Sequence, residues 1–236
     1  MKICILGMGN VATNLHHAFS LKNIRTEMHS SRQLSDLPEA DCYIYAVADQ
    51  AIEEVALQVN APKALHLHTS GTMPISVFGD DKPHAGVLYF FQSFSKAQLM
   101  DDWSEIPVFI EGRNIDDLAA IYTLAQTLTS RIFECSQHDR ERLHVAGVFA
   151  NNFTNLMYRI SADLLRDTQI PFQALLPLID QTAAKVHTLS PREAQTGPAK
   201  RNDRIVMAHH MSLLSPEQQA VYSLLSDLIQ KNGTRN

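Results

Sequence analysis

A glycine-rich turn separates an apolar run from an amphipathic helical pattern at the N-terminus. Residues 2–6 (KICIL) are apolar enough to form a buried strand, and residues 11–21 have the spacing of a helix with one buried face. The two segments are joined by the pattern G-x-G-x-x-A, in which Gly7 and Gly9 form the turn and Ala12 lies at the start of the helix. In this context the first glycine permits a tight turn, the second lets a pyrophosphate approach the backbone, and the alanine lets helix and strand pack closely. The segment predicts the first strand–helix unit of a dinucleotide-binding sheet.

Short apolar runs continue to alternate with helical patterns up to about residue 136. The further strands expected are residues 25–29, 41–47, 64–68, 85–91, 107–112 and 131–136. Helical patterns cover residues 49–59 and 116–128. Alternation of this kind indicates βαβ units with right-handed crossovers. The expected fold class is therefore α/β, a doubly wound and mostly parallel Rossmann sheet.

The pattern changes after residue 136, where no further strand is expected. Ser136 and Asp139 have the spacing of a helix N-cap, and the helical pattern that follows runs to about residue 167. Further helices are expected to start at Pro171, Ser190, Asp203 and Ser215. We expect a Rossmann domain over 1–136 and an all-helical domain for substrate binding and dimerisation over 137–236, with residues 233–236 frayed.

Charge and composition exclude several classes of protein. The formal net charge is -5, which argues against nucleic-acid binding because that usually needs a basic face. No apolar run approaches the ~20 residues of a membrane span, and the N-terminus lacks the cleavage site of a signal peptide. The three cysteines, Cys4, Cys42 and Cys135, are widely spaced and odd in number, so we expect reduced thiols in a cytoplasmic protein.

The chain has 11 histidines, but their spacing does not predict a metal site. No HExxH motif and no Cys/His pair at zinc spacing occurs. We therefore expect no bound metal.

The residues after the second expected strand indicate which dinucleotide binds. An NAD enzyme usually has an Asp or Glu there, which binds the ribose hydroxyls. This chain has His29, Ser30, Ser31 and Arg32 instead, and Glu27 falls inside the strand. Two hydroxyls and a guanidinium suit the 2′-phosphate of NADP(H). The alternative is a polar surface turn that binds nothing.

The ends of the third and fourth strands complete the expected cofactor site. Small residues follow the third strand, and a Ser-Gly pair follows the fourth. In an open α/β sheet, loops at the carboxyl ends of the strands line the ligand crevice. The residues expected to contact the dinucleotide are Gly7, Met8, Gly9, Asn10, Val11, Ala12, Ser30, Ser31, Arg32, Ala46, Val47, Ala48, Ser70 and Gly71.

The long helical pattern after residue 136 carries an unusual polar stripe. At about 100° per residue, His144, Asn151 and Asn155 fall near one line, with Asn152 at its edge and apolar residues opposite. A histidine can exchange a proton near neutral pH, and an asparagine can orient a carbonyl or imine. The stripe predicts one side of a binding cleft. A hydrogen-bonded network between helices is the alternative that remains open.

Three longer motifs resemble a known superfamily. They are YFFQSFS at 89–95, HVAGVFANNFTN at 144–155 and AQTGPAKRND at 194–203. With the N-terminal loop, they resemble a bacterial family of uncharacterised Rossmann-like proteins with a C-terminal helical domain of unknown function. That family is related to pyrroline-5-carboxylate reductase, 3-hydroxyisobutyrate dehydrogenase and deazaflavin-dependent NADP reductase. The resemblance covers essentially the whole chain and implies an NADP-linked oxidoreductase.

The chain departs from its relatives at several positions. The family commonly has His-Pro-Leu-Gln-Thr-Phe where this chain has Tyr89 to Phe94, although Gln92 is kept. The Ser-Gly-rich substrate loop of pyrroline-5-carboxylate reductase is absent, and no Lys occurs between Gln137 and Asp167, where the hydroxy-acid dehydrogenases use one. Proline synthesis and simple hydroxy-acid oxidation are therefore both disfavoured.

These observations together predict hydride transfer between a nicotinamide and a small carbonyl or imine substrate in the cleft between the two domains. The candidate catalytic residues are His144, Asn151, Asn155, Ser70 and Gln92, with His144 handling the proton. A non-catalytic NADP-binding sensor or scaffold is the main alternative, and a histidine-rich metal hydrolase is a weaker one.

The helical half is also expected to form a homodimer, because its several apolar helix faces need a partner surface. Lys200, Arg201 and Arg204 lie in or just after the polar loop between Gln195 and Asp203. They would bind a substrate carboxylate or phosphate, or else face solvent.

Overall fold

The computed structural model describes residues 1–233, so the frayed end expected at 233–236 lies outside the described residues from 234 onward. The chain divides into two compact units, Met1–Phe153 and Thr154–Asn236. The last strand ends at Glu134, so the change from strands to helices falls where the sequence predicts it. The first compact unit nevertheless continues to residue 153, because it includes the helical residues that follow the sheet.

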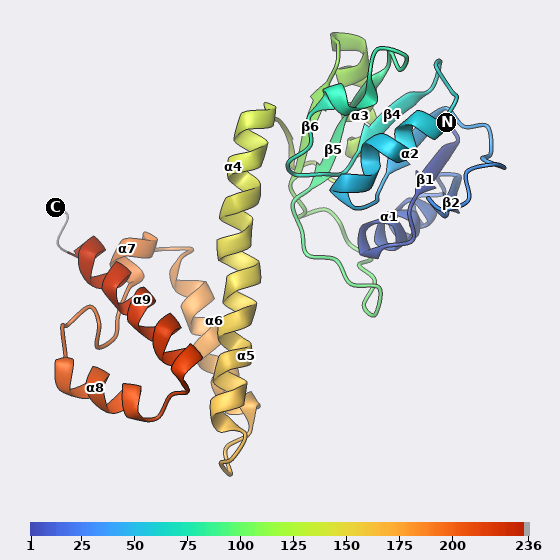
Figure 1. The fold of residues 1–236 in the computed structure, drawn as a ribbon. Helices are drawn as coiled ribbons and strands as arrows, with labels where there is room; N and C mark the ends of the chain where they lie inside the picture. The colour runs from blue at the N-terminus through green and yellow to red at the C-terminus, as the bar shows by residue number, and fades with distance from the viewer. Residues whose placement is uncertain (234–236) are drawn as a thin grey trace. The chain divides into compact units, whose positions relative to one another are not determined.

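The first unit is built on one mixed sheet (Figure 1). Within the described residues the sheet has seven strands in the order β2-β1-β3-β4-β5-β6-β7. All neighbours are parallel except β5 and β6, which are antiparallel. This confirms the predicted mostly parallel, doubly wound α/β fold. The strands are β1 (Ile3–Leu6), β2 (Thr26–His29), β3 (Cys42–Tyr45), β4 (Leu65–His68), β5 (Ala85–Phe90), β6 (Val108–Gly112) and β7 (Ile132–Glu134).

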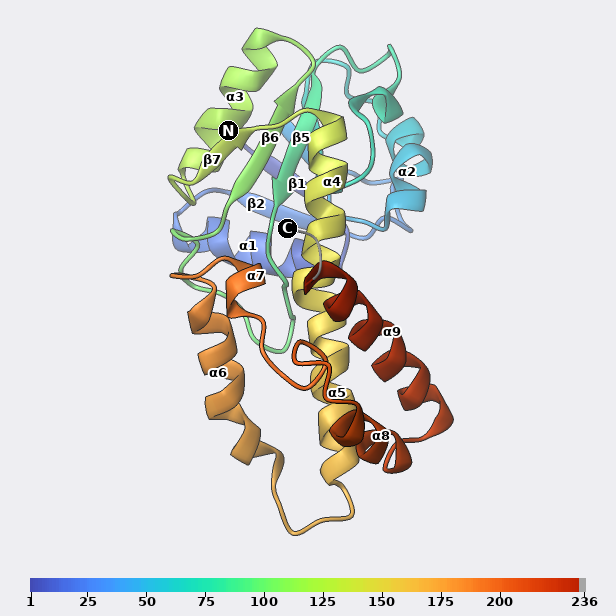
Figure 2. The same cartoon turned by 90° about the vertical axis from the view of Figure 1, so that its left-hand side faces the viewer.

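The central strands are apolar along their whole length because both faces of the sheet are covered. In β1, Ile3 and Ile5 belong to one hydrophobic cluster, and Cys4 and Leu6 belong to the other. Alternation between two cores follows from the two-residue period of a strand. Helices α1 (Asn10–Leu21) and α3 (Ile115–Gln126) pack on the first cluster, whereas α2 (Ile52–Gln58) packs on the second (Figure 2). Short 3₁₀ turns occur at η1 (Asp49–Ala51) and η2 (Ile75–Phe78).

Helix α4 (Gln137–Gly147) follows the sheet and begins as the sequence predicts. The side chain of Ser136 caps it by accepting a hydrogen bond of 3.2 Å from the backbone N–H of Asp139. A π-helical segment, η3 (Val148–Phe153), continues it to the end of the first unit. A π turn holds more residues than an α turn, so the regular 100° spacing assumed for the polar stripe does not hold through residues 148–153.

The second unit consists of helices. They are α5 (Thr154–Leu165), η4 (Phe172–Leu175), α6 (Leu176–Lys185), α7 (Pro191–Ala194), α8 (Arg204–Ser212) and α9 (Pro216–Gly233). The predicted caps are confirmed at Ser190, which forms a capping box with Glu193, and at Asp203, which accepts from Val206 N–H. The helix expected from Pro171 is divided instead, since a 3₁₀ turn precedes α6 and Pro177 lies in the first turn of α6.

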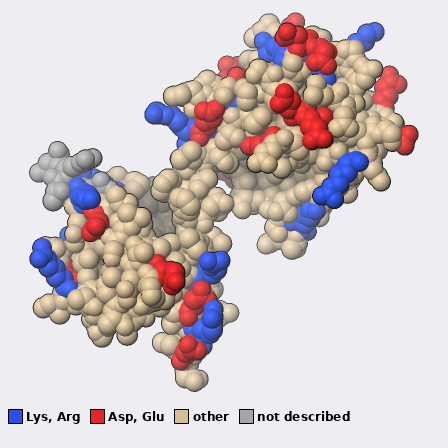
Figure 3. All heavy atoms as spheres, viewed as in Figure 1, with Lys and Arg blue, Asp and Glu red and all other residues tan. Residues whose placement is uncertain are grey.

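The described part of the second unit buries little apolar surface. Only Ala199 and Ser226 are buried among its described side chains. Several large apolar side chains are more than half exposed, among them Leu178, Ile205 and Leu213. Acidic and basic side chains are interspersed on the visible face of each unit (Figure 3). Among residues 1–233, no helix combines the length and hydropathy that a membrane span requires.

Candidate active site

The glycine-rich turn has the geometry that its sequence predicts. Gly7 adopts φ +131°, and a Cβ atom there would lie 2.2 Å from the carbonyl oxygen of Ala46. A side chain is therefore excluded on two grounds, backbone conformation and space. Gly9 is the N-cap of α1 and has no side chain to occupy the first-turn N–H groups. A Cβ at Gly9 would meet only the oxygen of Ala46, at 4.0 Å, so the helix N-terminus is open to an anionic group.

A cavity of about 680 Å³ lies over this turn and the adjoining strand ends. Most of the predicted cofactor residues line it, from the turn, the end of β2 and the end of β3. The lining residues are Gly7, Met8, Gly9, Asn10, Val11, Ser31, Arg32, Ala46, Val47, Ala48, Ala51, Glu54, Val55, Gln58 and Thr69. These residues fit the diphosphate and adenosine portions of a dinucleotide.

Four predicted cofactor residues do not line this cavity. Ala12 is fully buried and packs in the core, which is the role its small size predicts. The hydroxyl of Ser30 accepts a hydrogen bond of 3.3 Å from the N–H of Arg32. Ser70 and Gly71 lie beyond Thr69, which lines the cavity in their place.

Ser31 and Arg32 line this cavity just after the end of β2. Arg32 is exposed, and none of the described carboxylates forms an ion pair with it. Glu27 lies inside β2, as predicted, and pairs with Lys2 at 3.3 Å and with Arg25 at 3.6 Å. Its carboxylate is thus held away from the strand end, where an NAD enzyme would present one.

A second cavity, of about 430 Å³, adjoins the first and contains most of the predicted catalytic residues. Val11 and Thr69 line both cavities. The remaining lining comes from the end of β5, the loop after it, α4 and η3. These residues are Tyr89, Phe90, Phe91, Gln92, Ser93, His144, Gly147, Val148, Ala150, Asn151 and Asn152. The structure therefore brings Gln92 together with His144 and Asn151, which lie far from it in sequence.

His144 is half-buried and is held from two sides. Its Nδ1 lies 3.0 Å from the hydroxyl of Tyr89. A Cβ added at Gly71 would lie 2.7 Å from the same nitrogen, so the glycine gives the imidazole room to pack against the turn after β4. Burial raises the pKa of Tyr89 to about 12, so its hydroxyl keeps its proton at neutral pH. The cavity therefore presents an imidazole beside a neutral phenol.

A second glycine lets the π-helical segment approach the sheet. A Cβ on Gly147 would lie 2.7 Å from the ring of Phe91. Single-turn π segments inside helices occur often at functional sites. Here the segment carries Asn151 and Asn152, both exposed, into the cavity lining.

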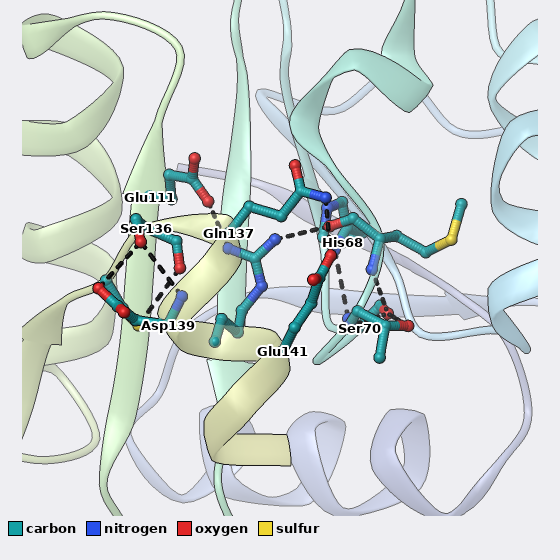
Figure 4. A network of polar contacts seen from close by, with 11 residues as sticks. His68, Ser70, Glu111, Ser136, Gln137, Asp139 and Glu141 are labelled. Atoms are coloured by element: carbon teal, nitrogen blue, oxygen red, sulfur yellow. Dashed lines mark hydrogen bonds and ion pairs between the residues drawn. The ribbon is translucent and has the colours of Figure 1, made fainter. Parts of the chain in front are cut away.

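A buried arginine anchors the start of α4 to the sheet, next to Ser136, Asp139 and Glu111, which Figure 4 labels. Arg140 is fully buried, forms an ion pair with Glu111 of β6, and donates a hydrogen bond of 2.6 Å to the carbonyl oxygen of Met73. His144 is one turn further on and thus on the same face of the helix. The charge pair and the Met73 contact explain why His144 faces the sheet.

Ser70 and Asn155 occupy different surroundings from those expected. Ser70 is buried, and its hydroxyl accepts hydrogen bonds of 3.0 Å from the N–H groups of Thr72 and Met73 (Figure 4). It lines neither cavity and shapes the turn instead. Asn155 belongs to α5 in the second unit and is exposed.

His66 and His68 of β4 are buried within the first unit. Burial lowers the pKa of His68 to about 3, helped by the charge of Arg140, and burial lowers the pKa of His66 to about 4. Both rings are therefore neutral at physiological pH. No group of three or more His, Cys, Asp or Glu side chains that could hold a metal occurs among residues 1–233.

Tyr89 and Thr69 are the site residues that sequence reasoning missed. Tyr89 lies in an apolar strand pattern, so it resembles a core residue. Their positions could have identified them, because both residues stand at carboxyl ends of strands, where ligands bind in open α/β sheets.

Comparison with known proteins places the chain in a family. A family described as a domain of unknown function, DUF2520, matches residues 106–229. A structure of the Bacteroides fragilis protein BF3122, which carries a provisional description as an NADP oxidoreductase, is 37% identical, with a TM-score of 0.92 and coverage of 98% of each chain. A search of curated proteins found no match.

Two more distant structures share the fold. Protein TM1727 from Thermotoga maritima is 18% identical, with a TM-score of 0.78, and the alignment covers 99% of this chain and 100% of that one. A reductive aminase from Aspergillus terreus, in complex with NADPH and ethyl levulinate, is 13% identical with a TM-score of 0.72, covering 98% of this chain and 92% of that one. On the family match over more than half its length and the 37% identity to BF3122, this chain belongs to the DUF2520 family.

Proposed function

We propose that this protein is an NADP(H)-dependent oxidoreductase that transfers hydride between the nicotinamide and a small carbonyl or imine carbon. One observation carries the proposal: the cavity that holds His144 shares Val11 and Thr69 with the cavity over the dinucleotide turn. A substrate in the cavity that holds His144 would therefore lie beside a cofactor in the cavity over the dinucleotide turn.

The described residues fit NADP(H) in three places. The open N-terminus of α1 after Gly7 and Gly9 would bind the diphosphate. The small residues Ala46 and Ala48 leave space for the adenosine ribose, and Arg32 would bind the 2′-phosphate. The description of BF3122 as an NADP oxidoreductase supports the same cofactor. Bound NADPH would supply the hydride.

The chain's own groups would complete the reaction. In the reductive direction the imidazolium form of His144 donates a proton to the substrate oxygen or nitrogen and is left neutral, while hydride adds to carbon and the C=O or C=N double bond becomes a single bond. Gln92, Asn151 and Asn152 are uncharged amides that can orient that oxygen or nitrogen. Phe91 supplies an apolar wall. This uncharged, half-apolar lining suits a small neutral carbonyl compound or imine. Asn155, which belongs to the second unit, remains a predicted catalytic residue.

The first test follows cofactor binding and turnover in the parent protein. We expect NADPH to bind, measured by its fluorescence, and its absorbance to fall with at least one aldehyde, ketone or cyclic imine of a panel. A parallel panel of alcohols and amines with NADP⁺ covers the reverse direction. Failure to bind NADPH would overturn the proposal, and tight binding without turnover in either direction would favour a sensor.

We also propose that the second unit forms a homodimer. Its described part has only two buried residues and leaves Ile205 85% exposed and Leu178 66% exposed. A second copy is the simplest partner for such faces, since two-fold pairing is the commonest closed symmetry. The three unpaired cysteines support a cytoplasmic location, where disulfides are rare.

The dimer is tested by light scattering at micromolar concentration, where we expect twice the mass of one chain. Ile205→Glu places a charge on an exposed apolar position of α8 and is expected to shift the protein toward monomer. Leu57→Glu is the matched control, because Leu57 is 74% exposed on α2 of the first unit. A monomeric parent protein, or equal dissociation in both variants, would contradict the proposal.

A further inference from the structure

The contact between Tyr89 and His144 has a direction that the chemistry of the two groups fixes. Burial keeps the phenol protonated, since the pKa of Tyr89 is raised to about 12. Among the described residues, no partner other than Nδ1 of His144 is found for this hydroxyl. If Nδ1 were the donor, the proton of a partly buried phenol would have no protein acceptor. Donation from Tyr89 to Nδ1 uses that proton and the nitrogen lone pair together.

We propose that Tyr89 is a positioning residue whose hydroxyl donates to Nδ1 of His144 and holds the neutral imidazole with its proton on Nε2. The inference rests on the proposed function for its catalytic meaning. Nε2 has no partner among the described residues and is the ring nitrogen left for a substrate. The hydrogen bond on one ring nitrogen sets which state the other takes.

The surroundings of the imidazole support this assignment. Gly71 packs against Nδ1, Cγ and Cβ of His144, so a side chain there would push the ring away from its place. Tyr89 in turn contacts Phe91 and Phe109 at ring-centroid distances of 6.1 Å and 6.5 Å. The phenol ring is therefore fixed by neighbours other than His144. The position of its hydroxyl is thus set by these ring contacts and does not depend on the hydrogen bond to Nδ1 of His144.

The test reads the protonation of His144 directly and needs no substrate. Protein with ¹⁵N-labelled histidine is studied by NMR at about pH 8.5, two units above the ordinary pKa of histidine. The signals of His144 are assigned by their loss in His144→Gln. We expect shifts typical of a protonated Nε2 and an unprotonated, hydrogen-bonded Nδ1. In Tyr89→Phe, which keeps the ring packing, both signals should move toward those of an exposed histidine.

The second unit offers a matched control. Nδ1 of His210 lies 2.9 Å from the hydroxyl of Tyr222, so Tyr222→Phe removes the same kind of contact elsewhere. It should change the signals of His210 and leave those of His144 unchanged. Gly71→Ala is a second, independent disturbance, because its methyl group would force the imidazole to move. It should alter His144 as Tyr89→Phe does.

The outcomes separate this inference from the proposed function. A proton on Nδ1 in the parent protein, or unchanged His144 signals in Tyr89→Phe, would overturn the role of Tyr89 even if the enzyme turns over. With a substrate in hand, Tyr89→Phe should lower kcat roughly 2- to 10-fold, the worth of one hydrogen bond, with NADPH affinity unchanged. An equal loss in Tyr222→Phe would also contradict a specific role.

Discussion

Replacement of His144 by glutamine is expected to reduce turnover by about 10²–10⁴-fold, the usual worth of a positioned general acid or base. The imidazole lines the cavity that adjoins the dinucleotide groove. Glutamine keeps a comparable length and a hydrogen-bonding group toward Tyr89, but it cannot exchange a proton near neutral pH. We therefore expect NADPH binding and the thermal unfolding temperature to change little.

Three measurements decide this prediction, namely steady-state turnover, NADPH titration and thermal unfolding. His138→Gln is the control, because His138 is an exposed histidine on the same helix, about 9 Å along the axis from His144 at 1.5 Å per residue. It should leave all three unchanged. If His144→Gln unfolds several degrees lower and retains most of its turnover, the imidazole stabilises the fold and does not handle the proton.

The sheet could be predicted from sequence because its strands carry a strong local signal. The central strands are buried on both faces, so each is an unbroken apolar run, as in residues 3–6 and 42–45. The turn after β1 could also be predicted from the sequence, since the φ of Gly7 is one that only glycine adopts readily. Both features depend on neighbours in the chain.

The candidate site was predicted only in part, because its contacts join distant segments. Periodicity placed His144 and Asn151 on one side of a helix, and both line the cavity. It could not reveal the π-helical segment that carries the asparagine, or the close approach of Gly147 to the ring of Phe91. The Tyr89–His144 contact spans 55 residues and leaves no trace in local pattern.

At Ser70 the difficulty is different, because local hydrogen bonds, and not position in the sheet, determine where the side chain points. It stands at the carboxyl end of β4, where ligand contacts are expected. Its hydroxyl instead accepts from the N–H groups two and three residues ahead, as serine often does in turns. Position at a strand end therefore identifies the crevice but not which side chain of the loop faces it.

Arg32→Ala is expected to weaken NADPH binding by about 10- to 100-fold and to leave NADH binding unchanged. A charge-assisted hydrogen bond to phosphate contributes about 1.5–3 kcal/mol, and 1.4 kcal/mol is a factor of ten in affinity. Arg32 is exposed, so solvent screening favours the lower end of that range. The selective loss follows because only NADPH carries a 2′-phosphate. The parent protein should accordingly prefer NADPH.

Fluorescence titration of parent and variant with both cofactors measures this selectivity. Arg25→Ala is the matched control, since it removes the same charge at the other end of β2, away from the cavity lining. Its effect should be small and equal for the two cofactors. Raising the salt concentration should reduce the NADPH preference of the parent more than that of Arg32→Ala, because the screened contact is already absent in the variant. Equal affinities of the parent protein for NADPH and NADH, or equal losses of both in Arg32→Ala, would show that the turn after β2 does not read the 2′-phosphate.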